Sequence, residues 1–165
     1  MKLLSLIVPV LNEEEAIPLF YEAVQEVLHD EPYELEILFV DDGSTDRTLE
    51  IIEGLHARDP RVRAISFSRN FGKELALAAG LQAARGDAVV PMDVDLQDPP
   101  ALLQQFLRLW EQGYETVIGV RSRRDADSWA KRVSAGLFYR LFNRLTKGRV
   151  VPNAGDYRLM DRVVV

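Results

Sequence analysis

The chain has 165 residues, 47% of them hydrophobic and 28% charged, which is the composition of one globular domain with a substantial core. It contains no cysteine and two histidines, which excludes a disulfide framework, a thiolate nucleophile and Cys-ligated zinc, and disfavours a His-based triad. The net charge of −6 is unevenly distributed: residues 1–120 hold 9 Lys and Arg against 22 Asp and Glu, whereas residues 121–165 hold 11 against 4. This asymmetry predicts a polyanion or membrane partner for the basic part.

Short apolar runs alternate with segments of helical periodicity along the first 120 residues. The runs predict strands and the periodic segments predict helices. In chain order we expect a strand over 3–8, a helix over 14–28, a strand over 34–40, a helix capped by Thr45 or Asp46 and ending near 56, a strand over 62–67, a helix over 74–84, a strand over 88–92, a helix over 101–112 and a strand over 115–120. This alternation predicts an α/β fold with a mainly parallel central sheet and helices on both faces.

A polar cluster follows each predicted strand. The clusters are residues 12–13, 41–42, 70–73, 93–95 and 121–124. Because the carboxyl ends of parallel strands share one edge of a sheet, we expect the clusters to gather there, where open α/β sheets bind ligands. Several clusters at one edge predict a binding site.

The fourth of these clusters has the pattern Asp-x-Asp. Asp93 and Asp95 are two residues apart, so in an extended stretch their carboxylates point the same way. A hard divalent cation with oxygen ligands relieves the repulsion between them, and Gln97 adds a neutral oxygen on the same side. Taken alone, so short a pattern more often marks a solvated acidic turn before a helix.

The loops lack the usual phosphate-binding motifs. Neither Gly-x-Gly-x-x-Gly after the first strand nor Gly-x-x-x-x-Gly-Lys-[Ser/Thr] occurs anywhere, which argues against a dinucleotide dehydrogenase and a P-loop ATPase. An acidic nucleotide site without a glycine-rich cradle would bind a diphosphate mainly through metal.

Five segments, in this order, resemble inverting glycosyltransferases of family 2, which have the GT-A fold. They are residues 7–13, 40–46, 68–74, 93–100 and 156–160. Within the family the chain is most similar to the polyprenyl-phosphate glycosyltransferases, the group that resembles dolichol-phosphate mannose synthase. The resemblance covers nearly the whole chain and implies a Rossmann-like three-layer sandwich around a mainly parallel sheet.

The resemblance implies a donor site for a nucleotide sugar. The residues that it assigns to the nucleotide sugar are Pro9, Leu11, Glu13, Val40, Asp41, Asp42, Lys73, Asp93 and Val94. Asp93, Asp95 and Gln97 would hold Mg²⁺ or Mn²⁺ on the diphosphate, where the metal neutralises charge on the leaving group. From the residues alone, Glu13 also fits a charge favoured by a helix N-terminus, and residues 41–44 also fit a turn with a cap.

A basic segment near the end of the sequence predicts an amphipathic helix over residues 128–150. Its apolar residues recur every four positions, and no acidic residue occurs between Ser128 and Gly155. This pattern fits a membrane-surface helix or an ordinary helix packed on the sheet with a solvated basic face. The resemblance favours the membrane surface and implies an acceptor-phosphate site formed by Arg124, Lys131, Arg132 and Ser134.

Two further residues are candidates for catalysis by resemblance. Arg121 would contact phosphate, which its guanidinium fork suits, although a solvated basic loop also explains residues 121–124. Asp156 would lie at the acceptor site, as general base for a sugar hydroxyl. A lipid phosphate has a second pKa of about 6 and is already largely ionised, so it needs positioning more than deprotonation.

The predicted organisation is one domain in three parts. Residues 1–127 form the nucleotide-sugar-binding core, 128–150 the interface helix, and 151–165 the acceptor-side motif and chain end. Members of the group usually continue into C-terminal transmembrane helices, whereas this chain stops at Val165, so we expect a truncated chain.

The sequence therefore predicts metal-dependent, inverting transfer of a hexose, with UDP-glucose as first choice of donor, to a polyprenyl phosphate. We expect the cytoplasmic face of the cell membrane as its location, self-association through an exposed apolar helix face, no nucleic-acid partner, and no apolar run long enough to span a bilayer. Two alternatives remain open. One is a saccharide acceptor with Asp156 as base, and the other is a non-catalytic nucleotide-binding module at the membrane surface.

Overall fold

The computed structural model describes the backbone of residues 1–120 and 154–165 and the side chains of residues 1–120 and 157–165. These residues form a six-stranded sheet in the order β3-β2-β1-β4-β6-β5. The strands are β1 (Lys2–Val10), β2 (Tyr33–Asp41), β3 (Val62–Ser66), β4 (Ala88–Pro91), β5 (Thr116–Val120) and β6 (Ala154–Asp161). The first four pair in parallel and β6 runs antiparallel to β4, which confirms the predicted α/β class and mainly parallel sheet.

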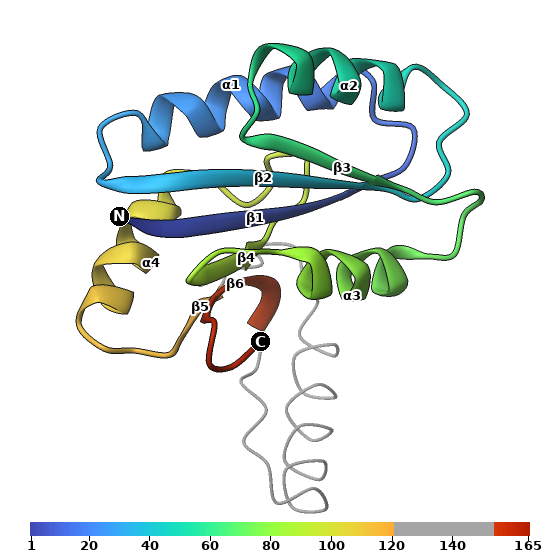
Figure 1. Ribbon diagram of the computed structural model, residues 1–165. Helices are drawn as coiled ribbons and strands as arrows, with labels where there is room; N and C mark the ends of the chain where they lie inside the picture. The colour runs from blue at the N-terminus through green and yellow to red at the C-terminus, as the bar shows by residue number, and fades with distance from the viewer. Residues whose placement is uncertain (121–153) are drawn as a thin grey trace, which may run out of the picture. The chain divides into compact units, whose positions relative to one another are not determined.

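Helices cover both faces of the sheet. They are α1 (Ala16–Leu28), α2 (Thr48–Arg58), α3 (Lys73–Ala83) and α4 (Leu102–Glu111). Figure 1 shows α1 and α2 on one side of β1 and β2, and α3 on the other. All four helices are predicted from the sequence, with ends that differ by up to two residues. At the start of α2, Asp46 rather than Thr45 contacts the backbone, since its Oδ1 accepts a hydrogen bond of 3.0 Å from the N–H of Thr48.

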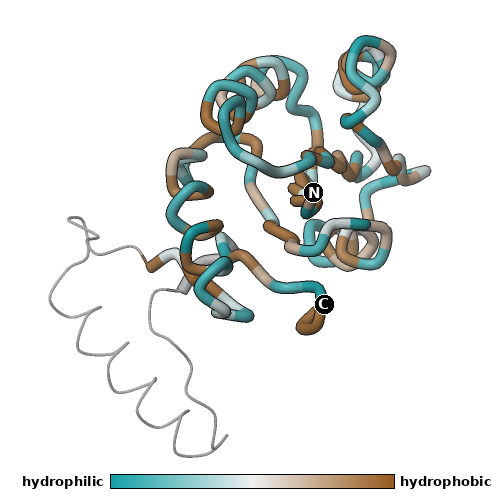
Figure 2. Tube along the Cα trace, turned by 60° about the vertical axis from the view of Figure 1, so that its left-hand side comes forward, coloured by the Kyte–Doolittle hydropathy of each residue, from teal (hydrophilic) through white to brown (hydrophobic). Residues whose placement is uncertain are grey.

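Two apolar clusters pack on opposite faces of the strands. The larger joins alternate residues of β1 and β2 to α1, α2 and α4, and includes an edge-to-face pair of Phe20 and Phe39 with centroids 6.1 Å apart. The smaller joins Ile7 and Val40 to Ala76 of α3. In Figure 2 the helices alternate between hydrophobic and hydrophilic residues along their turns, as expected of helices that cover a sheet.

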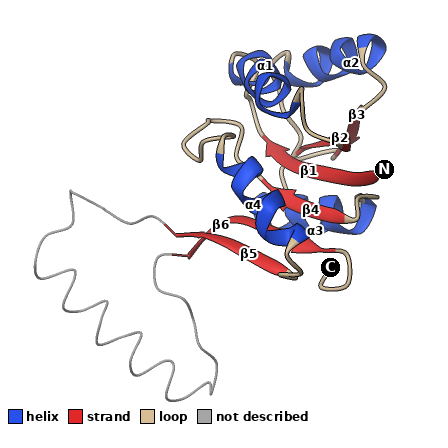
Figure 3. Ribbon diagram, turned by 90° about the vertical axis from the view of Figure 1, so that its left-hand side faces the viewer, coloured by secondary structure: helices blue, strands red, loops and turns tan. Residues whose placement is uncertain are grey.

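Strand β6 is not predicted from the sequence. It lies between β4 and β5, with Val89 opposite Met160, and residues 156–165 pack with residues 1–118 in one compact unit (Figure 3). The sequence pattern of β6 is a weak strand signal, because among its described side chains only Tyr157 and Leu159 are buried at alternate positions. The predicted interface helix over 128–150 and the boundary at 127 lie outside the described residues. No helix within the described part of the chain is both long and apolar enough to cross a bilayer.

A largely buried ionic network joins the amino-terminal halves of β1 and β2 to β3 and to the loop that precedes β4. The Glu36 carboxylate, 4% exposed, accepts hydrogen bonds from Ser5 Oγ, from Arg63 and, at 2.9 Å, from the backbone N–H of Arg85. Ser5 Oγ in turn accepts a hydrogen bond of 2.8 Å from Gly86 N–H. Burial raises the pKa of Glu36, but the three donors outweigh burial and hold that pKa below its ordinary value.

Candidate functional site

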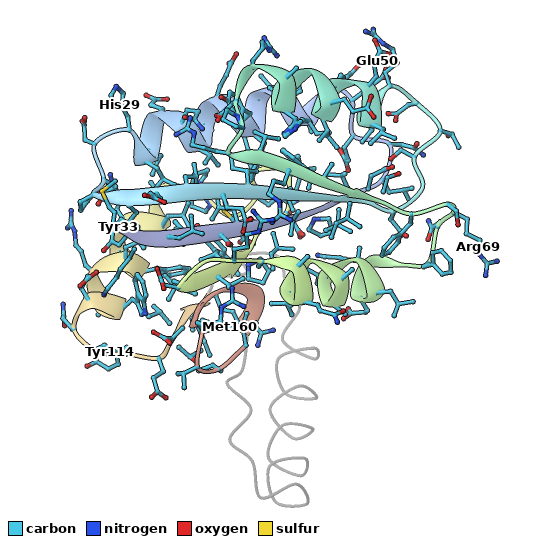
Figure 4. The ribbon with its side chains drawn as sticks, in the orientation of Figure 1. His29, Tyr33, Glu50, Arg69, Tyr114 and Met160 are labelled. Atoms are coloured by element: carbon cyan, nitrogen blue, oxygen red, sulfur yellow. The ribbon has the colours of Figure 1, made fainter. Side chains whose placement is uncertain are left out.

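A cavity of about 300 Å³ lies at the carboxyl ends of β1, β2 and β4. In Figure 4 Arg69 marks this end of the strands, whereas Tyr33 and Tyr114 lie at the opposite end. The cavity is lined by Pro9, Val10, Leu11, Glu13, Asp42, Asn70, Gly72, Lys73, Ala76, Asp93, Val94 and Asp95. The structure therefore brings together polar residues that are up to 82 positions apart in sequence, as the parallel sheet predicts.

Most of the residues that the resemblance assigns to the donor line this cavity. They are Pro9, Leu11, Glu13, Asp42, Lys73, Asp93, Val94 and Asp95. The sequence reasoning did not single out Val10 or Ala76, and it placed Asn70 and Gly72 in a polar cluster without a role. Ala76 had a usable signal, because it lies one helical turn after Gly72 and is a small residue in the first turn of α3.

The loops after β1 and β2 are joined by hydrogen bonds. Asn12 adopts a left-handed backbone conformation with φ of 55°, and its Oδ1 accepts a hydrogen bond of 2.8 Å from Thr45 N–H. The N–H of Glu13 donates to Thr48 Oγ1 at 2.8 Å. The Glu13 carbonyl accepts from the N–H of Ala16 and so starts α1. Glu13 thus combines the two sequence interpretations, a position at a helix start and a side chain at the cavity.

Asp42 ties the loop before α3 to the end of β2. Its side chain is almost fully buried, with Oδ1 accepting a hydrogen bond of 2.7 Å from Phe71 N–H and Oδ2 accepting one of 2.9 Å from Gly72 N–H. Since Lys73 is the first residue of α3, these two bonds set the position of its backbone at the cavity. Asp42 therefore positions the site as well as lining it.

Val40 and Asp41 do not line the cavity. Val40 is fully buried in the cluster under α3. Asp41 is 2% exposed, and its carboxylate accepts hydrogen bonds from Ser44 N–H at 3.0 Å and from Ser66 Oγ at 2.9 Å. Asp41 thus holds the loop after β2 in place and Val40 belongs to the core, while the contact of both residues with a nucleotide stays a prediction.

The Asp93–Asp95 segment is a turn, so the expected extended stretch is wrong. Strand β4 ends at Pro91, residues 94 and 95 form a turn, and Leu96 has a φ of 58°, which lies outside the extended region. Asp95 Oδ1 accepts a hydrogen bond of 3.0 Å from Gln97 N–H. Both carboxylates still line the cavity, whereas the exposed Gln97 does not, so its role as a metal ligand stays a prediction.

The carboxylates at the cavity fit a divalent cation that the phosphate groups of a substrate would also coordinate. Among residues whose side chains are described, no three Asp, Glu or His groups converge as a closed metal centre. Mg²⁺ is usually bound by one or two carboxylates together with phosphate oxygens and waters. Asp93 and Asp95 supply such a pair at the mouth of the loop after β4.

Strand β6 anchors the same loop. The Tyr157 hydroxyl donates a hydrogen bond of 3.2 Å to Pro99 O, and the Tyr157 ring packs 5.0 Å from Phe106. Burial raises the pKa of Tyr157, so it stays a neutral donor. The backbone of Asp156 precedes it in β6, but the Asp156 side chain lies outside the described residues. The other proposed catalytic and acceptor residues that lie outside them are Arg121, Arg124, Lys131, Arg132 and Ser134.

Comparison with known proteins identifies the family. Residues 5–165 match the model of glycosyl transferase family 2. The chain belongs to this family. The bactoprenol glucosyl transferase of Shigella phage SfV is 51% identical over 162 residues, which are 98% of this chain and 53% of that protein. A prophage bactoprenol glucosyl transferase homolog of Escherichia coli K12 is 49% identical, with 98% and 53% covered. The chain spans about half the length of these curated relatives.

Solved glycosyltransferase structures share the fold. Glucosyl-3-phosphoglycerate synthase from Mycobacterium tuberculosis, in complex with UDP, has a TM-score of 0.65 and 26% identity, covering 99% of this chain and 58% of that one. A mannosyltransferase from Pyrobaculum calidifontis, in complex with GDP-Man and Mn²⁺, has a TM-score of 0.56 and 28% identity, covering 74% and 36%. The predicted family and GT-A fold are confirmed.

Replacing Asp42 with Asn tests the positioning contact in this family 2 site. An amide offers one acceptor oxygen where two N–H groups need acceptors, so we expect a loss of about 1–3 kcal/mol in stability. Hydrogen exchange at the Phe71 and Gly72 amides should become faster, whereas Asp30→Asn at an exposed position should change neither quantity. Weaker nucleotide binding with unchanged exchange at both amides would instead show that Asp42 acts only by direct contact.

Proposed function

We propose that this chain carries the donor-binding part of a glycosyltransferase that moves a hexose to a polyprenyl phosphate. The first choice of donor is UDP-glucose. The observation that supports this most is the joint position of Glu13, Asp42, Lys73 and the Asp93–Asp95 pair around one cavity at the carboxyl edge of the sheet. The names of relatives that are about half identical to the chain support glucose and a polyprenyl acceptor.

Different residues of the cavity would bind different parts of the nucleotide sugar. Pro9, Val10 and Leu11 form an apolar wall suited to a nucleoside base. Asp93 and Asp95 would hold Mg²⁺ or Mn²⁺, which would stabilise negative charge on the departing diphosphate. Lys73, which contacts Asp93, adds a positive charge on the α3 side of the cavity.

The proposed sugar transfer is a single displacement, in which one bond forms as one bond breaks. An oxygen of the acceptor phosphate attacks the anomeric carbon and forms the new C–O bond, while the bond between that carbon and the nucleoside diphosphate breaks. In-line attack inverts the configuration at this carbon. We assign the acceptor phosphate to Arg121, Arg124, Lys131, Arg132 and Ser134, and we place Asp156 beside the acceptor.

The acceptor chemistry also suggests where the protein would act. The basic segment over 128–150 would lie on the cytoplasmic surface of the membrane, where a lipid phosphate can meet a water-soluble donor. Self-association through an apolar face is part of this proposal.

The test measures nucleotide binding and sugar transfer together. Calorimetric titration of UDP and GDP, with and without Mn²⁺, should show metal-dependent binding of UDP. A longer chain that covers the full length of the relatives should transfer radiolabelled glucose from UDP-glucose to undecaprenyl phosphate in detergent. Transfer to soluble sugars instead would point to a saccharide acceptor with Asp156 as base. Binding without transfer to any acceptor by the longer chain would point to a non-catalytic module.

A further inference from the structure

Lys73 and Asp93 form an ion pair inside the candidate donor site. The Lys73 ammonium lies 2.8 Å from Asp93 Oδ1 and 2.9 Å from Oδ2, so it contacts both oxygens of the carboxylate. The two side chains are 44% and 42% exposed, and both residues line the cavity. The pair links the N-terminus of α3 to the turn after β4.

The position of this ammonium conflicts with a cation on Asp93. A divalent cation at the Asp93–Asp95 pair would need at least one of the oxygens that Lys73 now contacts. A lysine ammonium held at contact distance from the same carboxylate would also repel the cation. Lys73 and the cation therefore compete for the Asp93 carboxylate.

The ion pair is weak enough to exchange. Exposed Lys–carboxylate pairs contribute little to stability because water and salt screen them and because the long side chains lose entropy. The lysine stem is flexible, so its ammonium can move several ångströms without moving the backbone. The backbone at Lys73 stays where Asp42 fixes the preceding amides of Phe71 and Gly72.

A nucleoside diphosphate would offer the displaced ammonium a new partner in the cavity. Asp42 is engaged by two backbone N–H groups, and Asp95 would share the cation with Asp93. A diphosphate entering between α3 and the turn after β4 would bring oxygens that carry negative charge to the same place. Lys73 would then donate to a phosphate oxygen near the start of α3, where the helix dipole also favours an anion.

We propose that Lys73 is an exchangeable counter-ion. It neutralises Asp93 in the donor-free protein, gives up its place when the cation arrives with a nucleoside diphosphate, and then contacts the diphosphate. This inference rests on the proposed donor site. It adds that lysine and cation compete for Asp93, so the cation binds weakly alone and tightly with the nucleotide.

The experiment compares Lys73→Met with Lys2→Met. Lys2 is a matched control because its ion pair with Glu111, at 3.1 Å, has similarly exposed side chains and does not line the cavity. Binding of Mn²⁺ is followed by the electron paramagnetic resonance signal of the free ion, first without nucleotide and then with saturating UDP. Calorimetry gives the affinity for UDP in the presence of Mn²⁺, and thermal unfolding checks that each variant is folded.

The two substitutions should behave differently. Lys73→Met should bind Mn²⁺ alone about five-fold more tightly than the unsubstituted chain, because the competing ammonium is gone. It should bind UDP with Mn²⁺ about ten-fold more weakly, because a charged hydrogen bond to phosphate is lost. Lys2→Met should match the unsubstituted chain in both measurements.

Two outcomes would overturn the inference in distinguishable ways. If the unsubstituted chain binds UDP with Mn²⁺ but Lys73→Met shows unchanged or weaker affinity for Mn²⁺ alone, then Lys73 does not compete with the cation and only this inference fails. If folded protein binds Mn²⁺ in none of the variants, with or without UDP, the proposed donor site fails and the inference fails with it.

Discussion

Replacing Asp95 with Ala should weaken Mn²⁺-dependent binding of UDP by about 100-fold or more. Substitutions in the outer shell of metal sites typically cost 10–100-fold in affinity, and loss of a carboxylate ligand should cost at least the upper end of that range. Asp95 is exposed, and its carboxylate accepts a hydrogen bond of 3.0 Å from the N–H of its near neighbour Gln97. The thermal stability of Asp95→Ala should therefore stay nearly unchanged, while calorimetric titration shows the loss of affinity for UDP.

Two controls separate the metal role of Asp95 from other effects. Asp95→Asn keeps an oxygen for the N–H of Gln97 but removes the negative charge, so it should lose binding nearly as far as Asp95→Ala. Asp30→Ala removes the same charge at a fully exposed position far from the cavity lining and should bind UDP normally. Wild-type affinity in Asp95→Ala would show that Asp95 is not a metal ligand.

Replacing Glu36 with Gln should lower the free energy of unfolding by about 3 kcal/mol at neutral pH. Removing one partner of a buried ion pair leaves the other uncompensated. Here the Arg63 guanidinium and the N–H of Arg85 would face an amide that carries no charge and has one acceptor fewer. Urea unfolding measures the change, and Glu34→Gln, exposed on the same strand, should stay within about 0.5 kcal/mol of the unsubstituted chain.

The cost of Glu36→Gln should depend on pH. The pKa of Glu36 in the folded chain lies below its ordinary value of 4.5, so its ionised form contributes stability that is fully present above about pH 4.5. That contribution is lost as the pH falls through the lower folded pKa, when the carboxyl takes up a proton. The two unfolding curves should therefore converge in acid. A difference that stays constant down to pH 3 would show that charge is not the source of the effect.

The sequence by itself was sufficient for the fold class, the first five strands and the four helices. These depend on local patterns, such as the apolar run of β1 and the periodicity of α1, which appear within 15 residues of chain. It was also sufficient to expect the polar clusters at one edge, because parallel pairing with helical connections leaves few topologies. The family resemblance then directed attention to most of the residues that line the cavity.

Only the tertiary structure decided which partners the polar side chains have. Three contacts depend on residues that are 20 or more positions apart. Strand β6 lies between β4 and β5, Asp42 accepts hydrogen bonds from the amides of Phe71 and Gly72, and Lys73 contacts Asp93. No local pattern encodes such pairs. A carboxylate can accept a hydrogen bond from a backbone amide or a lysine, or can coordinate a metal, and the packing of the strands decides which of these groups lies beside it. Local periodicity thus determined the elements, and long-range packing determined their chemistry.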